Sequence, residues 1–152
     1  MAESAAVWPA TAVVTGHGQG EPLLLDEPLS FWGGYDAAAG RIIEVGHPQF
    51  GINLAGRVLL MARAKGSSSS SSVLAEAIRN GTGPAAIIMR ERDLIVGLGC
   101  IVASELYGLH VPVLVVETSE WEAMRAQADS ASQAWAIGTE NCGDCVVRMV
   151  TQ

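Results

Sequence analysis

The stretch LAGRVLLMARAKGSSSSSSVLAEAI, residues 54–78, changes its hydrophobic pattern in the middle. Residues 54–61 form a short apolar run typical of a buried strand. Apolar residues between Val73 and Ile78 recur instead at the spacing of one helix face. Six serines, Ser67–Ser72, separate the two patterns. We therefore expect a strand, a serine loop and a helix in this order.

The rest of the chain also alternates short apolar runs with glycine and proline, and it shows no internal repeat. The first half reads as mainly β and the second half as alternating β and α, which predicts one α/β domain over residues 1–152 with a barrel-like or antiparallel part and a parallel part. We expect residues 1–10 to be a poorly ordered end. We expect strands near 11–14, 23–25, 41–45, 85–89, 111–116 and 146–150, a turn at 16–20, a helix from Asp93 to Tyr107 that ends at Gly108, and a helix with a capping box at Ser119–Glu122 that fades around 130–136.

Composition limits the possible partners. Of 152 residues, 49% are hydrophobic and only 16% are charged, so the surface is poor in charge and suits a buried partner interface. The formal net charge of −7 argues against nucleic acid, which needs a basic surface. No apolar run is long enough for a membrane span. An acidic residue near the amino terminus does not suit a secretory signal, so we expect a cytoplasmic protein.

The serine run is the main candidate site. At a helix start, free backbone N–H groups and the positive end of the helix dipole favour anions, and Lys65 adds a positive charge. A serine held there could also accept a proton. The alternative is a flexible serine-rich loop with one helix-capping serine. Six hydroxyls exceed what capping requires, which favours a site for a small anionic substrate.

A second candidate is the loop SFWGGYD, residues 30–36. Gly33 and Gly34 let the backbone approach a ligand or adopt a positive φ. Phe31 and Trp32 are costly to expose, so they either close the edge of the core or form the wall of a pocket or partner contact. Both alternatives stay open.

Other motifs are weaker. The glycines between residues 16 and 20 precede a strand rather than a helix, which favours a β-turn over a phosphate loop. His47 stands alone in a loop, and Cys100 lies among apolar residues of a helix. Cys142 and Cys145 form a CxxC pair, but metal sites of this kind need four ligands and a strand follows the pair. We therefore assign no metal ligand to this chain.

Several motifs occur together in one order. They are EPLLLDEPLSFWGGYD (21–36), GRII (40–43), HP (47–48), Gly51, LAGRV (54–58), KGS (65–67) with Ser71 and VL (73–74), PAAII (84–88), Gly99, ASEL (103–106) and VPV (111–113). This combination resembles the swivelling domain, or small subunit, of aconitase X over residues 11–118.

The resemblance implies a swivelling β/β/α domain, with a mixed barrel-like sheet and flanking helices. It also implies a larger subunit that holds an iron–sulfur cluster on its own cysteines, with the active site between the two chains. The reaction would be dehydration of a small hydroxy acid: cis-3-hydroxy-L-proline to Δ1-pyrroline-2-carboxylate, or, as the alternative, mevalonate 5-phosphate. An alternative of another class is a non-catalytic subunit whose serine loop binds a regulatory anion.

By the same resemblance, Ser67 directly after Gly66 is the position of the serine that removes the substrate proton. Ser71 matches a second family serine, whereas the serines between them replace a Cys, Thr or Val and a Gly of the family pattern. The expected substrate-binding residues are Lys65, Gly66, Ser68, Ser71, Ser30, Gly33 and Gly34.

Overall fold

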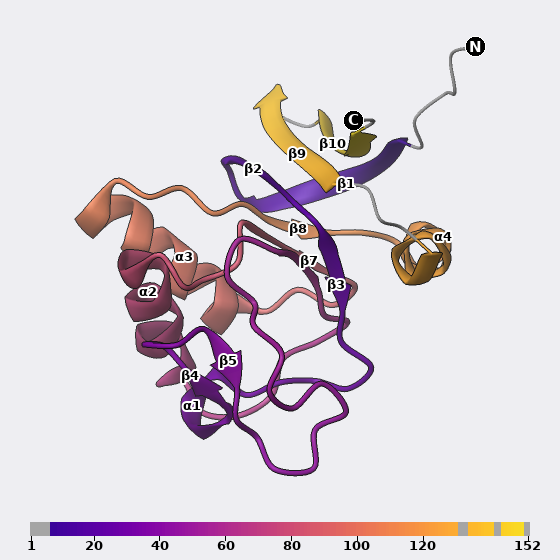
Figure 1. Cartoon of the computed structure of the whole chain (residues 1–152). Coiled ribbons are helices and arrows are strands. Elements are labelled where there is room, and N and C mark those ends of the chain that lie inside the picture. Colours follow the sequence, from indigo (N-terminus) through magenta and orange to yellow (C-terminus); the bar gives the residue numbers. More distant parts are fainter. Residues whose placement is uncertain (1–6, 131–133, 142–143, 151–152) are drawn as a thin grey trace.

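A strand, the serine loop and a helix follow one another in the computed structural model, which describes residues 7–130, 134–141 and 144–150 (Figure 1). The strand is shorter than the expected 54–61, because residues 55–56 form a turn and only Val58–Leu60 pair in the sheet. The helices are α1 (Phe31–Gly34), α2 (Ser70–Asn80), α3 (Leu94–Tyr107) and α4 (Thr118–Ser130). The strands are β1 (Val7–Val14), β2 (His17–Gly20), β3 (Pro22–Leu24), β4 (Tyr35–Asp36), β5 (Arg41–Ile42), β6 (Val58–Leu60), β7 (Ala86–Met89), β8 (Val113–Val115), β9 (Ala134–Asn141) and β10 (Asp144–Val150).

One mixed sheet organises the described residues. Its strand order is β2-β9-β10-β1-β8-β7-β6-β3, and β4 and β5 form a separate antiparallel pair. Strands β3, β6, β7 and β8 run parallel to one another. Strands β1, β10, β9 and β2 pair antiparallel, and β1 also joins β8 in the antiparallel direction. The expected division into a parallel and an antiparallel part is therefore confirmed.

Two hydrophobic cores lie on opposite faces of the parallel strands. In β7, Ile87 and Met89 join the core that contains Leu74 of α2 and Val96 of α3, whereas Ala86 and Ile88 join the core of Trp121 and Trp135. Successive side chains of a strand point to opposite faces, so a run that is apolar at every position must be covered on both. Figure 1 shows α2 and α3 on one side of the sheet and α4 on the other.

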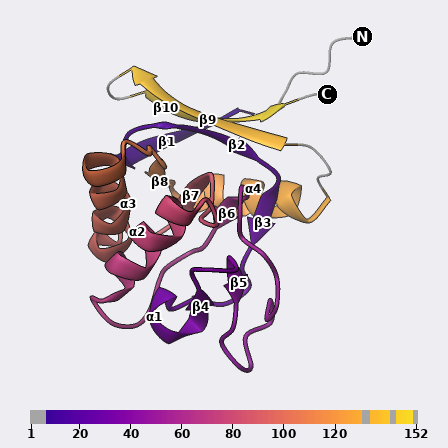
Figure 2. The same ribbon diagram turned by 60° about the vertical axis from the view of Figure 1, so that its left-hand side comes forward.

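The sheet curls until its two ends meet. Its edge strands, β2 and β3, are consecutive in the chain and separated by Glu21 alone (Figure 2). A Cβ on Gly20 would lie 2.0 Å from the carbonyl oxygen of Gly56, and one on Gly18 would lie 2.3 Å from that of Ala85. Glycine therefore lets β2 lie directly over the segments before β6 and β7, which makes the sheet barrel-like.

Arg57 fastens this closure. Its Nε donates to the Glu21 carbonyl at 3.2 Å, and its Nη2 donates to the Pro22 carbonyl at 3.0 Å. These bonds tie the link between β2 and β3 to the start of β6.

Four expectations for individual segments are wrong. Residues 7–10 belong to β1, where they pair with β10, rather than to an irregular end. Residues 17–20 form strand β2 rather than a turn, because β9 pairs with them. Residues 134–136 begin strand β9, whereas we expected a fading helix. Helix α4 begins at Thr118, so Ser119 lies inside it, and its hydroxyl donates to the Glu120 carboxylate.

The expected helix from Asp93 to Gly108 is confirmed at both ends. Of the described helices, none combines the length and the apolar character needed to cross a membrane.

Candidate functional site

The serine loop joins β6 to α2 and orders itself through its own backbone. The Ser67 Oγ accepts the Ser69 N–H at 3.1 Å, and the Ser67 carbonyl accepts the Ser70 N–H at 3.0 Å. The hydroxyls of Ser71 and Ser72 donate back to the carbonyls three residues earlier, at Ser68 and Ser69. Ser67 thus sits just before α2 and accepts one of the N–H groups that a helix start leaves free.

The structure brings the serine loop and the residue 30–34 segment together, although they were identified as separate motifs. The Trp32 N–H donates to the Ser70 Oγ at 3.1 Å, and the Ser30 Oγ donates to the Trp32 carbonyl at 2.8 Å. Gly66 has a φ of +103°, and a Cβ there would lie 2.0 Å from the Ser30 Oγ. Only glycine allows this backbone conformation and this close approach.

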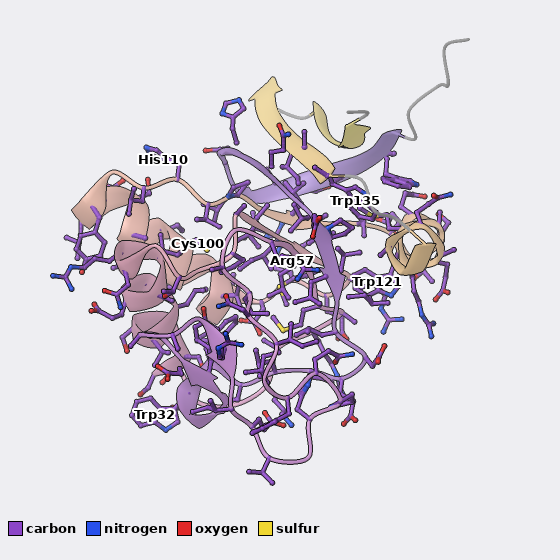
Figure 3. All side chains as sticks on the ribbon, in the orientation of Figure 1. Trp32, Arg57, Cys100, His110, Trp121 and Trp135 are labelled. Atoms are coloured by element: carbon purple, nitrogen blue, oxygen red, sulfur yellow. The ribbon has the colours of Figure 1, made fainter. Side chains whose placement is uncertain are left out.

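The segment around α1 presents different side chains to the core and to the surface. Phe31 is buried and packs edge-to-face against Tyr35, with ring centroids 5.3 Å apart. Trp32 is 57% exposed and lies at the outside of the molecule (Figure 3). Gly33 has a φ of +84° and open space around it, whereas Gly34 is buried against the side chain of Glu44. Phe31 therefore closes the core edge, whereas the Trp32 side chain stays largely exposed.

Lys65 is paired rather than free. Its Nζ lies 2.9 Å from the Glu44 Oε2. The hydrogen bond from Lys65 holds the pKa of Glu44 below its usual value, and the positive charge of Lys65 and the Ser30 N–H act in the same direction against the partial burial of the carboxyl group. Part of the positive charge expected at the serine loop is thus already compensated.

A small cavity of about 70 Å³ lies behind the serine loop. It is lined by Ala64, Lys65, Gly66, Ser67, Ser70, Asp93, Ile95 and Val96. Small-molecule sites usually measure roughly 300–1,000 Å³, so this cavity cannot enclose a metabolite on its own. Ser67, which lines this cavity, and the neighbouring Ser68 are both exposed.

Other candidates lie away from this cluster or serve the fold. The buried His47 accepts the Gln49 N–H on Nδ1 at 3.0 Å and faces the Glu27 carbonyl with Nε2 at 3.1 Å, so it braces the loop. Burial raises the pKa of the Cys100 thiol to about 12, so it is a core residue. Cys142 lies outside the described residues.

Within the described ranges, no three His, Cys, Asp or Glu side chains are grouped so that they could hold a metal ion. Sequence reasoning missed two residues of the site. Ser70 is the buried serine that fixes Trp32, and Glu44 is the partner of Lys65. Neither has a local signal, because each contact joins segments more than twenty residues apart.

A family model, the aconitase X swivel domain, matches residues 7–134 of the chain. Over 101 residues the chain is 46% identical to a cis-3-hydroxy-L-proline dehydratase of Pseudomonas aeruginosa, a match that covers 66% of this chain and 17% of that protein. Over 88 residues it is 43% identical to the phosphomevalonate dehydratase small subunit of Methanothermobacter thermautotrophicus, covering 58% of this chain and 67% of that one.

The fold is similar to the crystal structure of Thermococcus kodakaraensis aconitase X in its holo form. The TM-score is 0.76 at 24% identity, over 96% of this chain and 99% of that one. The chain thus spans about a sixth of the length of the Pseudomonas dehydratase and most of the archaeal small subunit. Since the family model covers most of the chain and the fold agrees, the protein belongs to the aconitase X swivel domain family.

Proposed function

We propose that this chain is the swivelling small subunit of a dehydratase that acts on a small hydroxy acid. The proposed reaction converts cis-3-hydroxy-L-proline to Δ1-pyrroline-2-carboxylate. The observation that carries this proposal is the exposed Ser67 hydroxyl just before α2, in a loop that bonds to itself through the Ser69 N–H and approaches Ser30 closely at Gly66. The 46% identity to a dehydratase named for this substrate supports the choice of substrate.

In this proposal Ser67 is the general base. Its oxygen takes the proton from C2 of the substrate, the C–H electron pair forms a C2=C3 double bond, and the hydroxyl group leaves C3 as hydroxide. The resulting enamine loses its N–H proton and gains a proton at C3, which gives the C2=N bond of Δ1-pyrroline-2-carboxylate. The Ser69 N–H that Ser67 accepts at 3.1 Å, together with the positive end of α2, would stabilise the deprotonated oxygen. Exclusion of water by a covering surface would strengthen both effects.

The substrate carboxylate would bind the loop beside Ser67. Lys65, Gly66, Ser68 and Ser71 are the proposed contacts on the loop itself, with Ser30, Gly33 and Gly34 on the facing segment. Because Lys65 is paired with Glu44, backbone and hydroxyl groups rather than a free cation would provide much of the binding. These groups match a carboxylate that is held while the chemistry occurs at the next carbon.

The large subunit would complete the site, and the chain would be active only in that complex, in the cytoplasm. An iron–sulfur cluster held by the large subunit would supply Lewis acidity at the leaving hydroxyl group. The grouping of ligands in the described residues does not suit a cluster on this chain, so no step is assigned to one here.

The phosphomevalonate dehydratase small subunit is the second candidate, favoured by 43% identity to one such protein. A phosphate needs more positive charge than a carboxylate. The cavity behind the serine loop has Lys65 as its cationic lining residue, and Glu44 already neutralises it. This observation favours the substrate without phosphate. A purely anion-binding subunit, without chemistry, is the alternative of another class.

The test is a dehydration assay with this chain and its cognate large subunit, separately and together, on cis-3-hydroxy-L-proline and on mevalonate 5-phosphate. We expect turnover of the first substrate in the mixture only. Ser67→Ala should lower kcat by about 10²–10⁴-fold with the complex intact, which is the contribution of a general base.

Ser72→Ala is the matched control, because Ser72 is also an exposed serine but bonds only to the Ser69 carbonyl. The complex with Ser72→Ala should have a kcat close to that of the wild type. If Ser67→Ala mainly raises KM, Ser67 binds the anion without acting as base. Turnover of mevalonate 5-phosphate alone would replace the proposed substrate.

A further inference from the structure

A second cavity, of about 380 Å³, lies at the carboxyl ends of the parallel strands, on the side of the sheet that α4 covers (Figure 1). Its lining includes residues at or just after the ends of β3 and β7 and residues from the first half of α4: Leu24, Asp26, Arg90, Trp121, Glu122 and Arg125. It shares no lining residue with the cavity behind the serine loop. Ligands of α/β sheets bind by preference outside the carboxyl ends of the strands, and small-molecule sites measure roughly 300–1,000 Å³. This cavity therefore has the position and the size of a small-molecule site.

Two arginines from different elements give the cavity groups that bind a carboxylate. The Arg90 Nη2 lies 3.8 Å from the Glu91 Oε2, and the Arg125 Nη1 lies 3.7 Å from the Glu122 Oε2. A charge-assisted hydrogen bond measures roughly 2.7–2.9 Å, so neither of these ion pairs is hydrogen-bonded. Each guanidinium group can therefore direct its planar fork of N–H groups to the carboxylate of a ligand.

Asp26 gives the same cavity a negative charge that is held in place. The Asp26 Oδ2 accepts a hydrogen bond from the Gln49 Nε2 at 2.8 Å, and the Asp26 N–H donates to the Gln49 Oε1 at 3.1 Å. This reciprocal pair fixes the carboxylate and engages one of its two oxygens. Gln49 is neutral, so the charge of Asp26 remains for a ligand.

The balance of charge decides the chemistry of the ligand. The lining carries two positive side chains, Arg90 and Arg125, and two negative ones, Asp26 and Glu122. A simple anion would face two carboxylates, and a simple cation would face two guanidinium groups. A small molecule with one charge of each sign is favoured instead, because each of its charges finds a partner of opposite sign.

We infer that this cavity binds a free amino acid with an apolar side chain. The carboxylate of the ligand binds Arg90 and Arg125, and its ammonium group binds Asp26. Its side chain contacts Leu24 and the buried Trp121, which belong to one hydrophobic cluster. The inference goes beyond the proposed function, because no step of the proposed dehydration uses α4.

L-leucine and two truncated analogues test the charge argument. L-leucine carries both charged groups, whereas 4-methylpentanoate lacks the ammonium group and 3-methylbutylamine lacks the carboxylate. Calorimetric titration of each compound into the full chain at neutral pH gives its Kd. We expect L-leucine to bind at least about tenfold more tightly than either analogue, because each analogue loses hydrogen bonds between charged groups. No binding of L-leucine up to about 10 mM, or equal affinity for one of the analogues, overturns the inference.

Two variants place the bound amino acid in this cavity. Arg125→Met removes one guanidinium group, and Asp26→Asn removes the negative charge but keeps an oxygen for the bond from Gln49. We expect each variant to raise the Kd for L-leucine at least about tenfold. Neither should lower the Tm of the chain, because Arg125 and Asp26 are exposed. Wild-type affinity in both variants contradicts the inference.

Arg79→Met is the matched control. Arg79 pairs with Glu76 three residues away, as Arg125 does with Glu122, and its side chain is 54% exposed against 58% for Arg125. It lies on α2, on the other side of the sheet (Figure 1). Arg79→Met should therefore leave the Kd unchanged. A loss of affinity equal to that of Arg125→Met would show a general effect of net charge and would overturn the inference.

Ser67→Ala separates this inference from the proposed function. This variant should bind L-leucine as the wild type does, even though the proposed dehydration depends on Ser67. If Ser67→Ala abolishes L-leucine binding and Arg125→Met does not, the amino acid occupies the serine loop and the inference fails. Failure of the dehydration assay alone leaves the binding measurements and their interpretation unchanged.

Discussion

Lys65 and Glu44 form an ion pair at the edge of the serine loop, which changes what the loop can attract. The side chains are 49% and 24% exposed, so solvent screens the pair and its contribution to stability is below about 1 kcal/mol. A substrate anion must compete with Glu44 for Lys65. The pair therefore also sets how strongly the loop responds to pH.

We expect Lys65→Met to raise the pKa of Glu44 toward its ordinary value of 4.5, because the hydrogen bond from Lys65 is the largest cause of the lowered value. In the wild type the folded-state pKa lies below the unfolded-state value. The stabilisation is then complete above about pH 4.5 and is lost as the pH falls through the folded-state pKa. The Lys65→Met variant should not show this loss of stabilisation at acid pH.

The measurement is an NMR titration of the Glu44 side-chain carbon, with urea unfolding from neutral to acid pH. Arg79→Met is the control, since it breaks the exposed Arg79–Glu76 pair of α2, at 2.8 Å, without touching Glu44. A Glu44 pKa that does not move in Lys65→Met would show that another group holds the carboxylate.

At the level of elements, α3 is positioned by its two ends. The Asp93 Oδ1 accepts the N–H groups of Ile95 and Val96, both at 2.9 Å. Gly108 ends the helix with a φ of +66°. Asp93 and its neighbours also line the cavity behind Ser67, so the cap that begins the helix also fixes the back wall of the site.

Asp93→Ala should lower the free energy of unfolding by about 0.5–2 kcal/mol, because two N–H groups of the first turn lose their acceptor. Asp93→Asn keeps a side-chain oxygen at the cap and should recover most of this loss. Urea unfolding of the two variants beside the wild type makes the comparison. If both variants lose the same stability, the carboxylate acts through its charge and not as a cap.

At the level of the whole molecule, closure of the sheet depends on a strand that carries glycine at alternate positions. Gly18 and Gly20 of β2 lie against the carbonyl oxygens of Ala85 and Gly56, where a Cβ would meet the backbone. Backbone atoms cannot move aside as the end of a side chain can. Strand β2 can therefore pair with β9 and still lie over the start of β6.

We expect Gly20→Ala to destabilise the fold by roughly 1–3 kcal/mol, as overpacking of a close contact does. Gly138→Ala is the matched control in the paired strand β9, because a Cβ there makes an ordinary contact at 3.8 Å with His17. Hydrogen exchange of β9 amides and urea unfolding measure the difference. Equal stability of the two variants would show that β2 does not need its close approach.

The fold and the site differ in how far they could be predicted. Helix α3 was predicted to the residue, because an Asp cap and a terminal Gly act within one turn of chain. The apolar run at residues 85–89 correctly predicted a strand, β7. Strand β9 was missed, because its pairing with β2 joins His17 to Gly138 across most of the chain. Its local sequence is alanine-rich, and its large buried side chains are Trp135 and Ile137.

The sequence by itself determined the mixed α/β class, the serine loop at a helix start and the family, because these depend on periodicity, capping and motifs within short segments. Only the tertiary structure decided that Trp32 bonds to Ser70 and that Lys65 is paired with Glu44. Each of these contacts joins segments that are distant in the chain. Such contacts exist only after the sheet has closed and brought the segments together.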